Sequence, residues 1–170
     1  MSDKRSQTLI LNHEEIQQKI TRMAWQILEN NYNAKTLVII GVEKKGSIVS
    51  QLLCDSLKEI SKLKLVLGSV YIDKENPTLE GISLTCDAEL EGNNVVLVDD
   101  VLNSGKTLMY ATLPILAQNP HQLQTAILAN RDHTRFPIKA DFVGISLATT
   151  LQEHIQFTQD KKGKMAVHID

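Results

Sequence analysis

The sequence predicts an α/β fold in which a mostly parallel, twisted sheet carries helices on both faces. Runs of apolar β-formers, typical of strands buried on both faces, alternate with stretches whose apolar residues recur at helical spacing. Twice, around 36–57 and 95–111, a strand is followed by a Gly-bearing polar loop and then by a helix, which is the order of a βαβ half-unit. The length of 170 residues fits one such domain. Ligands of these sheets bind at the carboxyl ends of the strands.

The elements can be assigned in chain order. Asn12 and Glu15 make a capping pattern ahead of an amphipathic run, which predicts a helix from about 13 to 30. A second helix carries apolar residues between 48 and 57. A third begins at about 106, and Pro114 predicts a kink or an early break in it. Strands are predicted over 36–40, 65–71, 81–85, 95–98, 123–129 and 141–145, with a terminal hairpin from Glu153.

Composition narrows the class of protein. A hydrophobic content of 42% with 22% charged residues is typical of a soluble globular protein, and the net charge of -2 gives no global nucleic-acid signal. There is no apolar run that could span a membrane and no secretory signal at the N-terminus. Cys54 and Cys86 are isolated and lack metal-ligand spacing, so two reduced thiols in a cytoplasmic protein are expected.

The stretch 95–107 has the features of an anion site. Four apolar β-formers lead to Asp99 and Asp100, and the loop Ser104-Gly105-Lys106-Thr107 then opens a helix. The first amides of a helix are unpaired and its dipole favours negative charge there. Gly105 lets the backbone approach a phosphate closely, and the neighbouring hydroxyls and lysine add donors and positive charge.

Two side-by-side acids next to a phosphate loop suit a pair of ribose hydroxyls or a hydrated Mg²⁺. The alternative is that Asp99 and Asp100 merely end a strand and cap a helix, but the buried strand before them and the Ser-Gly-Lys-Thr loop after them favour a ligand. A nucleoside-triphosphatase P-loop is excluded, since that motif needs Gly where the chain has Asp100.

The same residues closely resemble the phosphoribosyl-diphosphate (PRPP) signature of the type I phosphoribosyltransferases. The resemblance implies that fold, with a small hood formed mainly from about 130–170 and a single domain over 1–170. It also implies transfer of 5-phosphoribose from PRPP to a nucleobase with release of pyrophosphate. Mg²⁺ would be the cofactor, held by the catalytic pair Asp99 and Asp100 through water. PRPP would contact these residues: Asp99, Asp100, Val101, Asn103, Ser104, Gly105, Lys106 and Thr107.

A second loop suits the diphosphate. Lys44, Lys45 and Gly46 follow the strand at 36–40, and the family's corresponding loop binds pyrophosphate, often through an unusual cis peptide. Ordinary surface charge is the alternative for the two lysines. Family members also close a long mobile loop over the site, but the excursion at 73–78 is short and Lys74 is its only cation. This departure favours an alternative function, a nucleotide-binding regulator with weak or no transfer.

The resemblance covers nearly the whole chain and is best to the pyrimidine operon attenuation regulator/uracil phosphoribosyltransferase subgroup. That subgroup has a Thr-Arg in its first helix, as in Thr21-Arg22, and a loop and strand like 130–144. These imply base contacts from Asn130, Arg131, Phe142 and Val143. They also imply candidate RNA contacts from Arg22, His133 and Arg135, although Thr134 replaces an Arg of the pattern, so the RNA signal is partial.

Asn103 bears on the choice of base. Purine-salvage relatives have an Asp there, and an amide cannot serve as the base that the purine ring requires. Uracil, or no transfer at all, is therefore favoured over hypoxanthine or guanine. The family also implies a homodimer or higher homo-oligomer, with PRPP and a nucleobase or nucleoside monophosphate as ligands.

Overall fold

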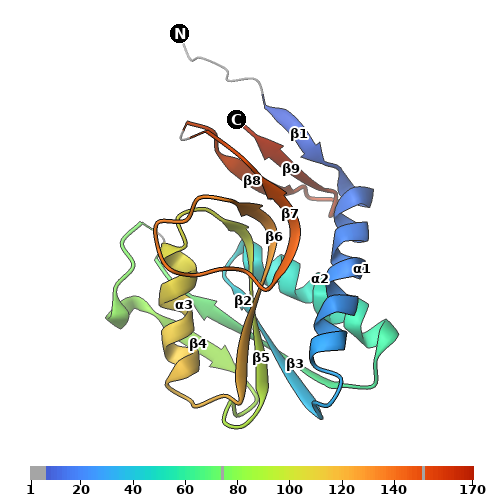
Figure 1. The fold of residues 1–170 in the computed structure, drawn as a ribbon, viewed down its shortest axis with the longest axis vertical. Coiled ribbons are helices and arrows are strands. Elements are labelled where there is room, and N and C mark those ends of the chain that lie inside the picture. The colour runs from blue at the N-terminus through green and yellow to red at the C-terminus, as the bar shows by residue number, and fades with distance from the viewer. Residues whose placement is uncertain (1–6, 74, 151) are drawn as a thin grey trace.

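The computed structural model describes residues 7–73, 75–150 and 152–170, and within them a central six-stranded sheet carries the site. The sheet order is β4-β3-β2-β5-β6-β7 (Figure 1). All neighbouring strands are parallel except β3 and β4. The strands are β2 (Thr36–Val42), β3 (Lys64–Tyr71), β4 (Ser83–Cys86), β5 (Asn94–Leu102), β6 (Gln122–Arg131) and β7 (Phe142–Leu147). The predicted mostly parallel sheet is confirmed.

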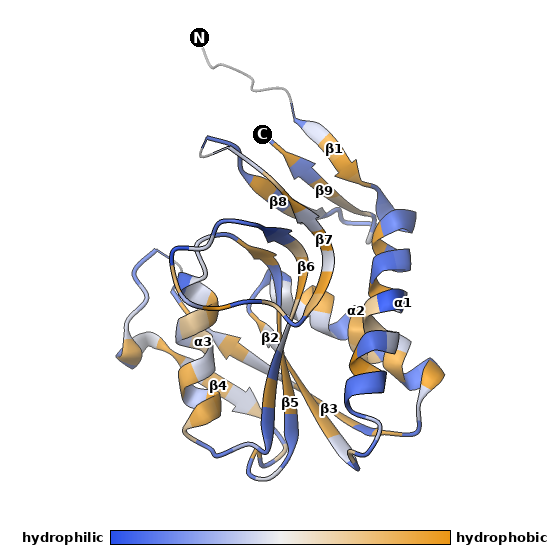
Figure 2. Cartoon of the chain, viewed as in Figure 1, coloured by the Kyte–Doolittle hydropathy of each residue, from blue (hydrophilic) through white to orange (hydrophobic). Residues whose placement is uncertain are grey.

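Helices cover both faces of this sheet, as predicted. Helices α1 (His13–Asn30) and α2 (Lys45–Ile60) share one core cluster with the sheet, and α3 (Lys106–Leu116) shares the other (Figure 1). The apolar colour is concentrated in the central strands and on the inner sides of the helices (Figure 2). None of the helices in the described residues is both long and apolar enough to cross a membrane.

The start of α1 follows directly from its sequence. The Asn12 side chain accepts a hydrogen bond from the Glu15 amide (3.0 Å), and the Glu15 carboxylate accepts one from the Asn12 amide (2.8 Å). This reciprocal capping box satisfies two amides that have no partner within the helix. The predicted helix over 13–30 is confirmed at both ends.

A second, three-stranded antiparallel sheet lies beyond the carboxyl ends of the parallel strands. Its order is β1-β9-β8, from β1 (Thr8–Leu11), β8 (Ile155–Gln159) and β9 (Met165–Ile169), and one 3-10 turn (Leu79–Gly81) precedes β4. The hairpin of β8 and β9 was predicted. Strand β1 was not, because four residues carry little periodicity and their partner β9 lies at the other end of the chain.

Several element boundaries differ from the prediction, and the differences in β5, β6 and α3 matter most for the site. Strand β5 continues through both acids to Leu102, because its pairing with β6 extends to that residue. Strand β6 continues to Arg131, so part of the expected polar loop is strand. Helix α3 passes Pro114 and ends at Leu116, two residues further on, which puts the proline in the last turn of the helix. Lys74 lies outside the described residues.

Candidate active site

The two acids of β5 are buried and face two neighbouring cavities. Asp99 is 2% exposed and Asp100 is 6% exposed. One Asp99 carboxylate oxygen accepts the Asp100 amide at 2.9 Å, which fixes the first carboxylate against the backbone of the second. Asp99 lines a small cavity of about 90 Å³, whereas Asp100 lines a larger one of about 440 Å³. The paired carboxylates thus stand on the boundary between two compartments.

The small cavity is formed where β5 ends and α3 begins. Its lining consists of Asp99, Val101, Leu102, Asn103, Ser104, Gly105, Thr107 and Leu108. Gly105 precedes the helix with φ +87°, a left-handed backbone conformation that residues other than glycine rarely adopt. The Lys106 amide donates to the Ser104 hydroxyl at 3.3 Å, which shapes the turn. The first turn of α3 therefore presents its amides to a space the size of a phosphate group.

A distant loop holds this turn in place. The amides of Arg135 and Phe136 both donate to the Ser104 carbonyl, at 2.9 and 3.1 Å. A Cβ atom on Gly105 would lie 2.8 Å from Ile138 of the same loop. The segment 135–138 is thus packed against the phosphate-loop backbone. The sequence contained no local signal for this contact, since thirty residues separate the two segments.

The larger cavity gathers side chains from four segments, including the loop after β2 and the end of β3. They are Glu43, Lys44, Lys45, Tyr71, Ile72, Asp100, Val101, Asn103, Ile155 and Gln156. The peptide bond between Glu43 and Lys44 is cis. Both lysines are exposed and line the same cavity as Asp100. Their contact with a diphosphate stays a prediction.

Gly46 brings α2 into contact with the acids. A Cβ atom at this residue would lie 2.8 Å from the Val98 carbonyl oxygen and 2.9 Å from an Asp99 carboxylate oxygen. Only a residue without a side chain allows the first turn of α2 to pack so closely on β5. Gly46 is buried in this contact, and its predicted part in binding pyrophosphate stays a prediction.

Strand β8 contributes a wall of the larger cavity that sequence reasoning missed. In the described chain β8 pairs only with β9, which leaves its other edge open. His154 and Asp170 exchange both backbone hydrogen bonds. Because bonding directions alternate along an antiparallel strand, the N–H and C=O of Ile155 point toward the open edge. Ile155 and Gln156 line the cavity there, more than fifty residues away from Asp100 in sequence.

The four residues predicted to contact the base lie outside both cavities. Asn130 donates to the Ser146 hydroxyl at 3.3 Å, and Phe142 is buried in the core beneath α1. The Val143 carbonyl accepts a hydrogen bond from Arg22. Arg131 donates to the Thr149 hydroxyl and to the Thr150 carbonyl. The described contacts thus join Asn130, Arg131 and Val143 to neighbouring segments and bury Phe142 in the core. Their contact with a base stays a prediction.

The segment after β7 is held from two sides. Besides Arg131, Glu153 accepts the Thr150 amide at 2.6 Å. This backbone hydrogen bond, with a further one from the Thr150 side chain, holds the pKa of the exposed Glu153 carboxyl below its usual range, and nearby Arg131 acts in the same direction. Arg131 therefore ties Thr149 and Thr150 to β6, and Glu153 is bonded to the same place.

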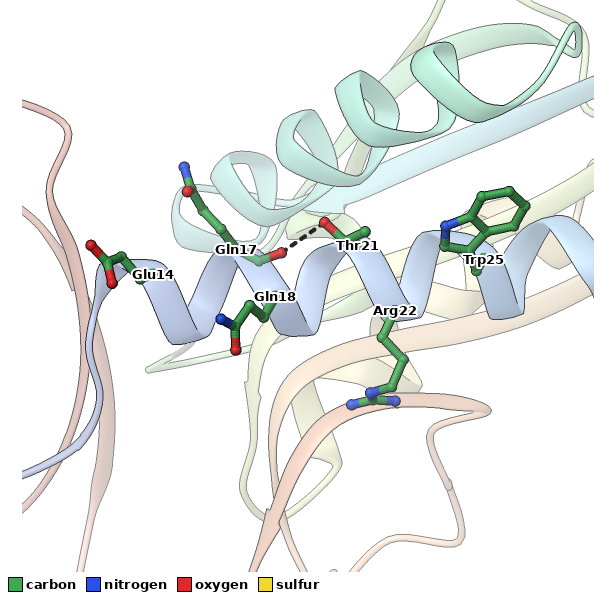
Figure 3. Close-up of a pocket in the computed structure, with 6 residues that line it drawn as sticks. All are labelled: Glu14, Gln17, Gln18, Thr21, Arg22 and Trp25. Atoms are coloured by element: carbon green, nitrogen blue, oxygen red, sulfur yellow. Dashed lines mark hydrogen bonds between the residues drawn. The ribbon is translucent and has the colours of Figure 1, made fainter.

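The candidate RNA residues are divided between two places. Arg22 lies on α1 and donates to Gln26 (3.0 Å) and to two β7 carbonyls, those of Val143 (2.9 Å) and Gly144 (2.6 Å). His133 and Arg135 are exposed on the loop after β6. Figure 3 shows the Arg22 side chain projecting from one side of α1 and the Trp25 ring from the other, next to a groove along the helix. This groove of about 700 Å³ is lined by Glu14, Gln17, Gln18, Thr21, Arg22 and Trp25.

The donor set at the acids fits a hydrated magnesium ion. Mg²⁺ usually keeps several waters and uses one or two carboxylates, and Asp99 with Asp100 supplies two. No group of three His, Cys, Asp or Glu side chains placed to hold a metal occurs in the described parts of the chain. The residues therefore suit an ion carried in with a phosphorylated substrate better than a metal bound in an all-protein cage.

Comparison with known proteins agrees with this arrangement. The model of the phosphoribosyl transferase domain matches residues 6–162, and the chain belongs to that family. Among curated proteins it is similar to the bifunctional protein PyrR of Geobacter sp. (strain M21), with 33% identity over 92% of this chain and 93% of the relative. The bifunctional protein PyrR of Fusobacterium nucleatum is 30% identical over 95% of this chain and 96% of its own length.

Solved structures show the same fold. Trypanosoma cruzi hypoxanthine phosphoribosyltransferase superposes with a TM-score of 0.77 and 20% identity, covering 94% of this chain and 95% of the other. A hypoxanthine-guanine phosphoribosyltransferase from Bacillus anthracis gives 0.70 and 20%, covering 82% of each chain. The fold class inferred from the PRPP-like signature is therefore confirmed.

Proposed function

We propose that the protein transfers 5-phosphoribose from PRPP to uracil and releases pyrophosphate. The observation that carries this proposal is the position of Asp99 and Asp100 between two cavities. The small cavity would take the 5-phosphate, and the larger one would take the diphosphate and a base. The ribose of PRPP would bridge the two, with its hydroxyls at the acids.

Each part of the site has a defined role in this reaction. The α3 amides with Ser104 and Thr107 would bind the 5-phosphate. Asp99 and Asp100 would orient the ribose hydroxyls directly or through Mg²⁺-bound water, and Mg²⁺ would neutralise charge on the diphosphate. Lys44 and Lys45 would stabilise the same diphosphate as it leaves. Uracil N1 forms its bond to the ribose carbon while the bond from that carbon to pyrophosphate breaks, and the N1 proton passes to water.

The open edge of β8 is evidence in favour of a base that carries an imide group. The Ile155 N–H and C=O lie on the open edge beside Asp100 and Asn103, where they could pair with the adjacent C=O and N–H of uracil. Asn103 adds an amide that donates and accepts but cannot take a proton from a purine ring. Catalysis would come from positioning and from electrostatic stabilisation of the leaving group.

The transfer reaction is tested with isotopic uracil, PRPP and Mg²⁺, followed by separation of the mononucleotide. Hypoxanthine, guanine, xanthine and orotate serve as competing bases. The Asp99→Asn/Asp100→Asn double variant should lose PRPP binding and turnover, whereas Asp55→Asn, an exposed carboxylate on α2, should retain both. Absence of product with every base at high protein concentration would eliminate the proposal.

A nucleotide-binding regulator is the second candidate function. Two features favour it: the PyrR relatives are named bifunctional, and the larger cavity includes a carboxylate, Glu43, beside its lysines. Calorimetry should then show tight binding of nucleoside monophosphates despite negligible turnover. Filter binding with pyrimidine-operon leader RNA tests RNA recognition, and a lack of salt-sensitive binding would count against it.

A further inference from the structure

Glu43 occupies an unexpected position for a site that is to hold a diphosphate. It follows β2 directly and lines the larger cavity next to Lys44 and Lys45. Among the described residues, the charged side chains in the lining are these two lysines, Glu43 and Asp100, so two cations face two carboxylates there. The described part of the lining therefore offers no net positive charge to an anion that enters this cavity.

The Glu43 side chain is held in place from β3. Its Oε1 atom accepts a hydrogen bond from the Ser69 hydroxyl at 2.8 Å, and its backbone amide donates to the Val70 carbonyl at 2.9 Å. Glu43 is only partly exposed, so its charge is screened less than that of a fully exposed surface residue. The carboxylate is thus a fixed negative charge in the wall of the cavity.

We infer that Glu43 determines which phosphorylated ligand the site prefers, by weakening diphosphate binding relative to nucleoside monophosphate binding. This inference rests on the proposed function, in which the diphosphate lies near Lys44 and Lys45. A nucleoside monophosphate places its single phosphate in the separate cavity at 103–107 and leaves the space near Glu43 uncharged. The carboxylate therefore repels pyrophosphate and the PRPP diphosphate but has little effect on UMP.

The consequence is a site that keeps UMP bound when PRPP is also present, because Glu43 weakens only the binding of PRPP. Removing the Glu43 charge should tighten binding of pyrophosphate and of PRPP roughly tenfold, since a single charge acting on a multivalent anion at this range is worth at least that factor. The UMP affinity should change by less than about twofold, so the ratio of the two affinities is the diagnostic quantity.

The test is calorimetric titration of wild type and Glu43→Gln with Mg²⁺-pyrophosphate and, separately, with UMP. Glu59→Gln serves as the matched control, because it makes the same change on an exposed residue of the last turn of α2. Ser69→Ala keeps the charge but removes the bond that holds it, and a partial gain in pyrophosphate affinity is expected. Thermal melting checks that each variant is folded.

The outcomes separate this inference from the proposed function. A Glu43→Gln variant that binds pyrophosphate no more tightly than wild type overturns the inference. Weaker binding also overturns it, and would indicate a carboxylate that recruits the metal of the diphosphate. If neither wild type nor variants bind pyrophosphate, the inference fails as well. If the affinity ratio shifts as expected but no base is converted to a nucleotide, the transferase proposal fails and the role of Glu43 stands.

Discussion

Replacing Gly46 with alanine tests whether close packing of α2 on β5 positions the acids. The added methyl carbon would lie 2.8 Å from the Val98 carbonyl oxygen and 2.9 Å from an Asp99 carboxylate oxygen. Carbon and oxygen atoms in contact normally remain about 3.3 Å apart or more. Either the first turn of α2 or the acid-bearing part of β5 must therefore move by about half an ångström.

The cost in stability should be modest and the cost in binding larger. Overpacking costs about 1–3 kcal/mol, while alanine gains up to about 1 kcal/mol over glycine in a helix, so a net loss of roughly 0–3 kcal/mol is expected. The displacement acts directly on Asp99, and a shift of this size should reduce PRPP affinity about tenfold, or about 1.4 kcal/mol.

Gly68→Ala provides the matched control. A Cβ atom there would lie 2.9 Å from the Thr85 carbonyl oxygen and 3.0 Å from Cys86 Cβ, so the crowding is comparable but lies between β3 and β4. Urea unfolding measures stability, and calorimetry with Mg²⁺-PRPP measures binding. We expect both variants to lose stability and only Gly46→Ala to lose affinity. Equal PRPP affinities in the two variants would refute the positioning role of Gly46.

Three further predictions concern other parts of the chain. Gly105→Ala forces a side chain into a left-handed conformation that costs about 1–2 kcal/mol, so calorimetry should show roughly tenfold weaker UMP binding; unchanged affinity would remove the phosphate loop from the proposal. Arg22→Leu removes hydrogen bonds to two β7 carbonyls and should lower the free energy of unfolding by about 1–2 kcal/mol, whereas exposed Arg135→Leu should not. Burial raises the pKa of the Cys54 thiol, so a thiol reagent at neutral pH should modify Cys86 first and Cys54 only after denaturation; two fast thiols in the native protein would contradict this.

Local sequence signals were sufficient for most of the fold. The capping pair Asn12 and Glu15 predicted where α1 begins, and runs such as 36–40 and 95–98 predicted strands because burial on both faces demands continuous apolar side chains. The phosphate loop was also predictable, since Gly105 and the acids before it lie within one continuous motif. The structure gives Gly105 a positive φ there.

The remaining parts depend on contacts between distant segments. Aspartate is disfavoured in strands, yet pairing with β6 carries β5 through Asp99 and Asp100 to Leu102. Residues 155 and 156 reach the larger cavity only because β8 joins β9 in a second sheet. Similarly, Arg22 is bonded to strand carbonyls more than one hundred residues further along the chain, and no periodic pattern in α1 indicates such a partner.

The amides of Arg135 and Phe136, which donate to the Ser104 carbonyl, affect the design of chimeras between relatives. The loop after β6 donates two backbone hydrogen bonds to the turn that would bind the 5-phosphate. A replacement loop that keeps the side chains but not the backbone path therefore loses these bonds and leaves the turn less rigid. A chimera that alters the length or backbone path of 132–138 should then lose its hold on every 5-phosphorylated ligand at once, whichever base is offered.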